Sequence, residues 1–214
     1  MILEDLSREM LDLFEAKDGA RERSLHLSRR SIRESAAAIR AVHRQEVELA
    51  EEHIEEAGLA LREVEELLRD HPDVRYAGFV EDALQEYAEA RIVLSLISRR
   101  EIPPPEEVGA GLLGYLSGLG DVTGELRRHI LDLIRQGEPE EGEFFLQTME
   151  EIHHLLMLFD YPEAITRGLR RKSDLARSML ERTRGDLANA IGRRRLEVRL
   201  EELEDKLKAA DHPL

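Results

Sequence analysis

Cysteine and tryptophan are absent from this sequence of 214 residues, and all aromatic residues together make up only 4% of it. Without cysteine the chain forms no disulfide bond and no thiolate metal site, so any metal must have oxygen or imidazole ligands. No apolar run approaches the ~18 residues of a membrane-spanning helix, and no apolar signal region precedes a cleavage site. We therefore expect a soluble, cytoplasmic protein.

Signals for β-structure are also scarce. Few runs are rich in valine, isoleucine or threonine, and Asn-Gly hairpin turns are absent. Leucine is frequent and charged residues make up 36%, which favours long amphipathic helices. We predict an all-α fold of seven helices, with one domain over residues 1–214. The predicted helices span residues 2–45 with a kink near Gly19, 46–70, 74–100, 107–136, 141–158, 163–184 and 186–209.

The net charge of −15 argues at first against a nucleic-acid partner, but the charges are segregated along the chain. Residues 21–44 contain seven arginines against two glutamates, a local charge of +5. Residues 167–199 contain eleven arginines or lysines against four acids, a local charge of +7. Such stretches either are solvated basic faces or attract phosphate groups.

Two pairs of acidic residues stand at helical spacing within otherwise apolar surfaces. Glu86 and Glu89 are three residues apart, and Asp121 and Glu125 are four apart, so each pair shares one helix face. Like charges repel, and burial disfavours ionisation, so a divalent cation between the carboxylates would remove an energetic penalty. The ordinary alternative is that both pairs are solvated, as most glutamate pairs on helices are.

Pro103, Pro104 and Pro105 form a stiff link between the helices that carry these pairs. Because consecutive helices usually pack together, we expect an antiparallel arrangement that places all four acids near one another. Carboxylates favour hard ions such as Mg²⁺ or Mn²⁺. A metal held there would suit phosphodiester hydrolysis, because it activates water and stabilises the developing charge.

Glycine is frequent in the predicted helix 107–136, at positions 109, 111, 114, 118, 120 and 124. Each interior glycine lowers helix stability by ~1 kcal/mol relative to alanine, so the positions need a reason. We expect close backbone approach by a neighbouring helix. Near the C-terminus, Leu196, Leu200, Leu203 and Leu207 form a coiled-coil-like seam that packs within the subunit or across an interface.

Residues 150–154, Glu-Glu-Ile-His-His, offer a different metal chemistry. The Glu-x-x-His spacing of Glu150 with His153, and of Glu151 with His154, occurs in carboxylate-bridged di-iron bundles. Those bundles need the motif on two helices, and the sequence contains no clean second copy. A di-iron oxidase or metal store is therefore an alternative that predicts iron in the purified protein.

Several of these segments together resemble the translin/Trax family. The most specific are LQEYAEA at 84–90 and YLSGLGDVTGELRR at 115–128, and the others are residues 23–29, 41–44 and 169–172 with Asp174. The similarity covers nearly the whole chain and is closer to Trax (translin-associated factor X), in a short, archaeal-type form that lacks the long insertion before the fourth helix.

The resemblance implies a seven-helix, all-α subunit that assembles with translin, or with itself, into a closed octameric shell. Trax-like subunits are Mg²⁺-dependent endoribonucleases, and their catalytic, metal-binding acids correspond here to Glu86, Glu89, Asp121 and Glu125. Because all four are present, we expect a catalytic subunit that cleaves single-stranded RNA, and a homo-octamer. The alternative is a translin-like scaffold that binds single-stranded RNA or DNA without cleaving it.

By the same resemblance, the basic segments face nucleic acid. The expected RNA-binding residues are Arg29, Arg30, Arg33, Arg40, His43, Arg44, Arg170, Arg171 and Lys172. Their contacts with phosphate would be independent of base sequence.

Overall fold

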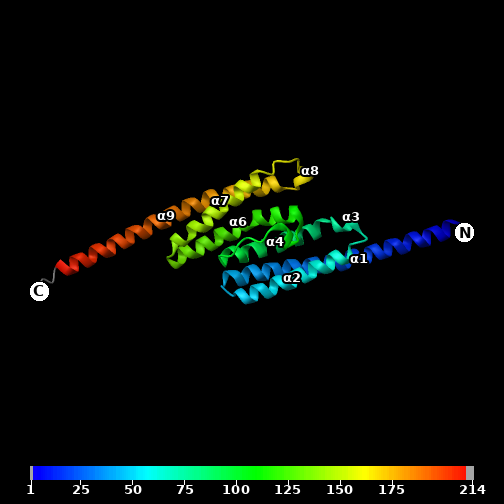
Figure 1. Cartoon of the computed structure of the whole chain (residues 1–214), viewed down its shortest axis with the longest axis horizontal. Coiled ribbons are helices and arrows are strands. Elements are labelled where there is room, and N and C mark those ends of the chain that lie inside the picture. The colour runs from blue at the N-terminus through cyan, green and yellow to red at the C-terminus, as the bar shows by residue number, and fades with distance from the viewer. Residues whose placement is uncertain (1, 211–214) are drawn as a thin grey trace. The chain divides into compact units, whose positions relative to one another are not determined.

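The structure, a computed structural model, describes residues 2–210, and within that range it contains helices and no strand (Figure 1). The predicted all-α class is confirmed. The elements in chain order are α1 (Ile2–His43), α2 (Val47–Leu67), α3 (Pro72–Arg75), α4 (Gly78–Ile97), α5 (Pro105–Val108), α6 (Gly111–Gln136), the 3₁₀ turn η1 (Pro139–Glu141), α7 (Gly142–Met157), α8 (Glu163–Thr166) and α9 (Leu169–Ala210).

The predicted break at Gly185 is wrong. The helices expected over 163–184 and 186–209 are instead the short α8 and the continuous, 42-residue α9. One interior glycine lowers helix stability by ~1 kcal/mol, which is too little to interrupt a helix with good helix-forming residues on both sides. For the same reason α1 continues without a break through Gly19.

The start of the fourth long helix also differs from the prediction. Residues 105–108 form the separate α5, and Gly109 and Gly111 have left-handed backbone conformations, with φ of 71° and 68°. Glycine adopts such angles without steric strain, so these two residues turn the chain before α6 begins. The expectation of close helix packing at Gly109 and Gly111 is therefore wrong.

The chain divides into two compact units, residues 1–122 and 123–214, and the boundary falls within α6. Because one helix belongs to both units, the single domain expected over residues 1–214 stays a prediction. None of the helices within residues 2–210 is both long and apolar enough to cross a membrane.

In the first unit α1 packs along α2 and α4, and Figure 1 shows α1 and α2 side by side. Small residues line the contact: Ser24, Ser28, Ser31, Ser35, Ala38 and Ala41 are all fully buried. Short side chains let the helix backbones come near each other, and their burial leaves little room for substitution.

In the second unit α7 packs against α9. A Cβ atom at Gly142, the first residue of α7, would lie 2.9 Å from Cδ1 of the buried Leu187 on α9. Arg127 on α6 is tied to α9 by hydrogen bonds from its guanidinium to Thr183 Oγ1 at 3.0 Å and to Asp186 Oδ2 at 2.8 Å. These contacts hold the C-terminal half of α6 and the middle of α9 together.

Candidate functional site

The first acidic pair lies in the middle of α4. Glu89 is buried, with 8% of its surface exposed, between Ala88 and Ala90, which are fully buried. Glu86, one turn earlier, is half-buried. An ionised carboxylate at the position of Glu89 is costly in an apolar environment unless charge or hydrogen bonds compensate it. The sequence left open that this pair is solvated, and the burial of Glu89 excludes that alternative for this residue.

α6 crosses α4 at this level with almost no side chain between them. A Cβ atom at Gly118 would lie 2.7 Å from the backbone oxygen of Gln85 and 2.9 Å from the backbone nitrogen of Glu89. One turn earlier, a Cβ at Gly114 would lie 3.3 Å from Leu84 Cβ. The predicted close backbone approach is therefore confirmed at these two glycines. At Gly124 a Cβ would meet no atom within 4 Å, so that position has no such requirement.

The expected antiparallel arrangement of these two helices is wrong. Gly114 lies against Leu84 and Gly118 against Ala88, so α6 advances in the same direction as α4. The cause is the link of residues 98–110. An extended segment of that length spans ~40 Å, twice the ~20 Å from Leu84 to Ile97 along α4, so the chain has room to return before α6 starts.

Two side chains fasten this returning link. Tyr115 donates a hydrogen bond from its hydroxyl to the backbone oxygen of Pro103 at 3.0 Å, and burial raises the pKa of the Tyr115 hydroxyl. Arg91 on α4 donates to the backbone oxygen and to Oε1 of Glu107, both at 2.8 Å. Both contacts hold the link beside α4, and they fix where α6 begins.

Asp121 joins the two helices directly. The Nε2 amide of Gln85 donates a hydrogen bond to Asp121 Oδ2 at 2.7 Å. Gln85 directly precedes Glu86, and Asp121 follows Gly118 by three residues on α6. Asp121 is thus held against α4 beside the first acidic pair, through an amide and not through a shared cation. The convergence of all four acids stays a prediction.

Glu125 lies one turn beyond Asp121 on α6, just past the boundary between the two units. Its carboxylate is about a quarter exposed and lies 3.7 Å from the guanidinium of Arg128. Among the residues that the structure describes, no three His, Asp or Glu side chains lie close enough together to hold a metal ion. The carboxylate and amide oxygens of Gln85, Glu86, Glu89 and Asp121 suit a hard ion chemically. The metal itself stays a prediction.

The arginines of α1 are exposed, but they differ in their charge partners. Arg30 is paired with Glu56 of α2, and Arg44 with Glu46 at 2.7 Å. The other three arginines predicted to bind RNA in α1, Arg29, Arg33 and Arg40, form no ion pair with any residue in the range 2–210. His43 is half-buried. Paired and unpaired arginines could not be told apart from the sequence, because the acids involved lie outside α1, on α2 or just before it.

The basic residues of the second unit lie in the first turn of α9. Arg170 and Arg171 are exposed and Lys172 is half-buried. Arg170 also lines a cavity of about 470 Å³ together with His153, Asp174 and Arg177. Burial lowers the pKa of His153, and the neighbouring His154 lowers it further.

The di-iron alternative has no support in the geometry. Glu150 accepts a hydrogen bond from the guanidinium of Arg184 at 2.6 Å, and Glu151 accepts one from Gln147 at 3.0 Å. The ring centres of His153 and His154 are 6.1 Å apart. Both glutamates are thus paired with other side chains, and among the described residues these four do not form a group that could hold a metal ion.

Sequence reasoning missed Gln85, Tyr115 and Arg91 as residues that organise this region. Gln85 lies within the LQEYAEA segment, but the helical period alone does not reveal which polar residue faces α6. The proline-rich link predicted a stiff connection, but it did not indicate in which direction α6 runs relative to α4. A signal was present in its length, since residues 98–110 are more than a tight connection between antiparallel helices requires.

These features define the chain as an all-α subunit in which a buried acidic segment of one helix is packed on a glycine-rich, acid-bearing helix. Comparison with protein families agrees with the resemblance: the Translin family model matches residues 19–183, and the chain belongs to that family. A relative of similar length is an uncharacterized protein of Methanocaldococcus jannaschii. It is 31% identical over 193 residues, which cover 88% of this chain and 84% of the relative.

Solved structures of C3PO proteins share the fold. The structure of AfC3PO with duplex RNA has a TM-score of 0.78 and 31% identity, covering 91% of this chain and 98% of that chain. The crystal structure of AfC3PO gives 0.77 and 32%, covering 91% and 99%. The structure of apo-NeC3PO gives 0.73 and 26%, covering 88% and 96%.

Substitution of Gly118 by alanine tests the contact between α4 and α6. The added methyl group would meet backbone atoms, which cannot move aside as a flexible side chain can, so we expect the free energy of unfolding to fall by ~1–3 kcal/mol. Gly124→Ala in the same helix is the matched control, and it should raise stability by up to ~1 kcal/mol, because a Cβ there meets no atom. Urea denaturation followed by circular dichroism measures both. Equal effects of the two substitutions would contradict the close crossing.

Proposed function

We propose that this chain is a metal-dependent endoribonuclease subunit that cleaves single-stranded RNA, with Glu86, Glu89, Asp121 and Glu125 as the residues that hold Mg²⁺ or Mn²⁺. The observation that carries the proposal is the hydrogen bond from Gln85 to Asp121, at the level where Gly118 packs on the backbone of Glu89. Membership of the Translin family and similarity to AfC3PO, whose structure was solved with duplex RNA, support RNA as the substrate.

Each residue has a defined task in this proposal. Glu89 and Asp121 are the inner ligands, because the crossing of α4 and α6 fixes their helices. Glu86 and Glu125 are both half-buried, and they are the other two members of the proposed ligand set. A bound hard cation supplies charge stabilisation and a water of lowered pKa at the scissile phosphate. Gln85 holds Asp121 in place through its amide and keeps the carboxylate turned toward α4.

RNA would be held by exposed cations through its phosphates. Arg29, Arg33 and Arg40 are the best candidates in α1, because their charges are not neutralised by neighbouring acids in the described structure. Arg30 and Arg44 would contribute less, because they already pair with glutamates. His43 would also contribute less, because it is half-buried. Arg170, Arg171 and Lys172 would bind phosphate from the second unit.

We also propose that the subunits assemble into a homo-octamer. Two surfaces support assembly. Leu196, Leu200, Leu203 and Leu207 on α9 are all more than half exposed, so the predicted seam is not packed within its own subunit. The N-terminal part of α1, which projects past α2 in Figure 1, exposes Met10, Leu13 and Phe14. Apolar surfaces of this kind commonly mark interfaces.

The alternative proposal is a translin-like scaffold that binds single-stranded RNA or DNA without cleaving it. It is favoured by the observation that no three acidic or histidine side chains within residues 2–210 converge as metal ligands. In that case binding weakens with salt, and no divalent ion produces cleavage.

Substitution of Glu89 by glutamine separates the two proposals. The amide keeps the shape of the side chain and removes the charge that would hold the metal, so we expect Mg²⁺-dependent cleavage to fall by at least ~100-fold. Binding of the same RNA should not change. Cleavage of fluorescent single-stranded and duplex RNA, with Mg²⁺ or EDTA, is the measurement, and Glu52→Gln on the exposed face of α2 is the control. Wild-type activity in Glu89→Gln would exclude the acid site.

The difference between paired and unpaired arginines can be tested by the salt dependence of RNA binding. Each lost phosphate contact on a single strand should reduce the slope of log K against log salt concentration by ~0.7. We expect this reduction for Arg29→Ala, Arg33→Ala and Arg40→Ala, and a smaller one for Arg30→Ala and Arg44→Ala. Fluorescence anisotropy at several salt concentrations gives the slopes. A larger effect for the paired arginines would contradict the assignment.

The assembly can be tested by substituting Leu200 and Leu203 with glutamate. Charges placed on the exposed seam oppose its burial between subunits, so we expect the assembly to dissociate into smaller species. Sedimentation velocity measures the particle mass against the 24.5 kDa chain. The matched control is the exposed Leu112→Glu, which lies outside both surfaces. An unchanged mass in the double variant would exclude the seam as an interface.

A further inference from the structure

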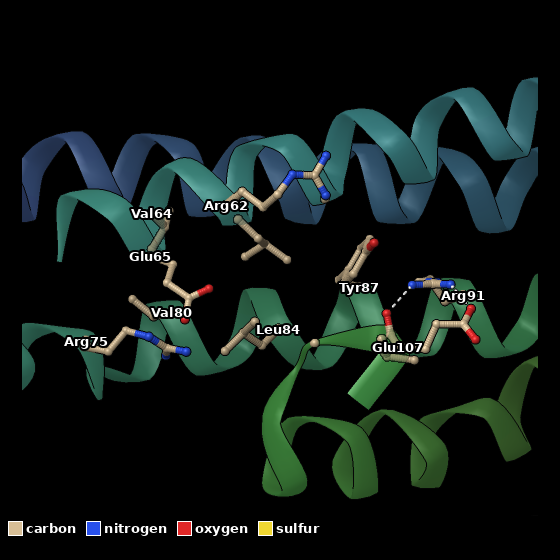
Figure 2. A pocket seen from close by; sticks show the side chains of 13 residues that line it. Arg62, Val64, Glu65, Arg75, Val80, Leu84, Tyr87, Arg91 and Glu107 are labelled. Atoms are coloured by element: carbon tan, nitrogen blue, oxygen red, sulfur yellow. Dashed lines mark hydrogen bonds and ion pairs between the residues drawn. The ribbon is translucent and has the colours of Figure 1, made fainter. Parts of the chain in front are cut away.

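A cavity of about 210 Å³ lies in the first unit, apart from the contact between Asp121 and Gln85. Figure 2 shows the side chains that line it, contributed by α2, by α3, by α4 and by the link that contains α5. Its charged lining residues are Arg62, Glu65, Arg75, Arg91 and Glu107. Three arginines around one small cavity favour an anionic ligand.

One of the three arginines is already engaged. Arg91 donates two hydrogen bonds to Glu107, drawn as dashed lines in Figure 2, and so it fastens the returning link. Arg62 and Arg75 form no ion pair with any residue in the range that the structure describes. The guanidinium of Arg75 lies 5.9 Å from the ring centre of the adjacent Tyr76. Two cations on the cavity wall are therefore available to a ligand.

The hydroxyl of Tyr87 is a third available group. Tyr87 is 92% buried, lines the cavity, and makes no hydrogen bond to the described part of the chain. The hydroxyl is not among the buried polar atoms that lack a partner, so it stays accessible from the cavity and can donate a hydrogen bond to a ligand there.

Gly58 keeps space open between two of these donors. A Cβ atom at this position would lie 2.8 Å from Tyr87 Oη and 3.5 Å from Arg62 Nη1. Both donors therefore lie beside Gly58, where α2 has no side chain. Any larger residue would occupy the point on which they converge.

The rest of the wall is aliphatic, and it lengthens the cavity along α4. Val80 and Tyr87 are seven residues apart on that helix, a distance of ~10 Å. Val64, Val80, Leu84 and Val108 are all buried along this length. Glu65 and Arg75 line the cavity near Val80, at the end away from Tyr87, as Figure 2 shows. The cavity thus has a cationic end, an apolar floor, and a polar end with both a donor and an acceptor.

We propose that this cavity binds a phosphomonoester of a small sugar, with the phosphate between Arg62 and Tyr87 and the sugar hydroxyls toward Glu65 and Arg75. A guanidinium with an added hydroxyl donor suits the several oxygens of a phosphate dianion. The volume lies below the ~300–1,000 Å³ of pockets that enclose drug-sized ligands, so the site takes a phosphate and its sugar, with any base outside. The source is a free sugar phosphate or mononucleotide, or the 5′-phosphorylated end of an RNA strand.

The experiment is a titration of the full-length protein, without divalent ions, by isothermal calorimetry. The probes are ribose 5-phosphate, adenosine 5′-monophosphate and ribose. We expect the two phosphates to bind and ribose not to bind. Tyr87→Phe, which removes one hydroxyl, and Arg62→Gln should each weaken binding by about tenfold. The control is Arg69→Gln, an exposed arginine of the same region that pairs with Glu66 and does not line the cavity.

Two further arms identify the source and guard against misfolded variants. An RNA with a 5′-phosphate that binds more tightly than its 5′-hydroxyl twin, with the difference lost in Arg62→Gln, assigns the site to RNA ends. Equal binding of the twins assigns it to free sugar phosphates, provided ribose 5-phosphate binds. In the wild type, ribose 5-phosphate should slow hydrogen–deuterium exchange in residues 58–65 and 72–76.

Absence of binding by every phosphate probe would overturn the proposal. So would equal losses in Arg62→Gln and Arg69→Gln, or exchange protection only in other segments. The Glu89→Gln variant should bind ribose 5-phosphate as the wild type does, because the cavity does not include that residue. The outcome is therefore separate from that of the nuclease proposal.

Discussion

The contact on which the rest of the first unit depends is the crossing of α6 over α4 at Gly118. There the space for a side chain is missing, and the backbone of α6 lies against Gln85 and Glu89. The crossing fixes which residues of the two acidic motifs can meet, and it brings Asp121 within hydrogen-bonding distance of Gln85. It also explains why α6 has glycine at positions 114 and 118, although each interior glycine lowers helix stability by ~1 kcal/mol.

Hydrophobic period and composition were sufficient to predict the all-α class and the approximate bounds of the long helices α2, α4, α6 and α7. They were insufficient to predict where a helix breaks at a glycine and in which direction α6 runs. Gly185 marks no break, because neighbouring helix-forming residues outweigh one glycine. The direction of α6 depends on the path of residues 98–110, and that path is set by hydrogen bonds of Arg91 and Tyr115 to distant backbone atoms. Such tertiary contacts leave no periodic signal in a sequence.

Charge on this molecule is arranged by helix pairing as well as by sequence. α2 is rich in glutamate, and it neutralises part of the arginine surface of α1 through contacts such as Arg30 with Glu56. The local charge of residues 21–44 therefore overstates the attraction for phosphate, and the arginines that keep their charge uncompensated matter most. The same distinction singles out Arg62 in the cavity of the first unit. In both places we infer phosphate binding from an arginine that has no acidic partner in the described structure.

The central claim is that Glu89 and Asp121, brought close by the helix crossing, hold one hard cation. Anomalous diffraction from a crystal soaked in Mn²⁺ tests it most directly. The account predicts one strong peak within ~2.3 Å of carboxylate oxygens from both residues, as expected for metal–oxygen coordination. A peak confined to other residues, or none near Asp121 at saturating Mn²⁺, would contradict it.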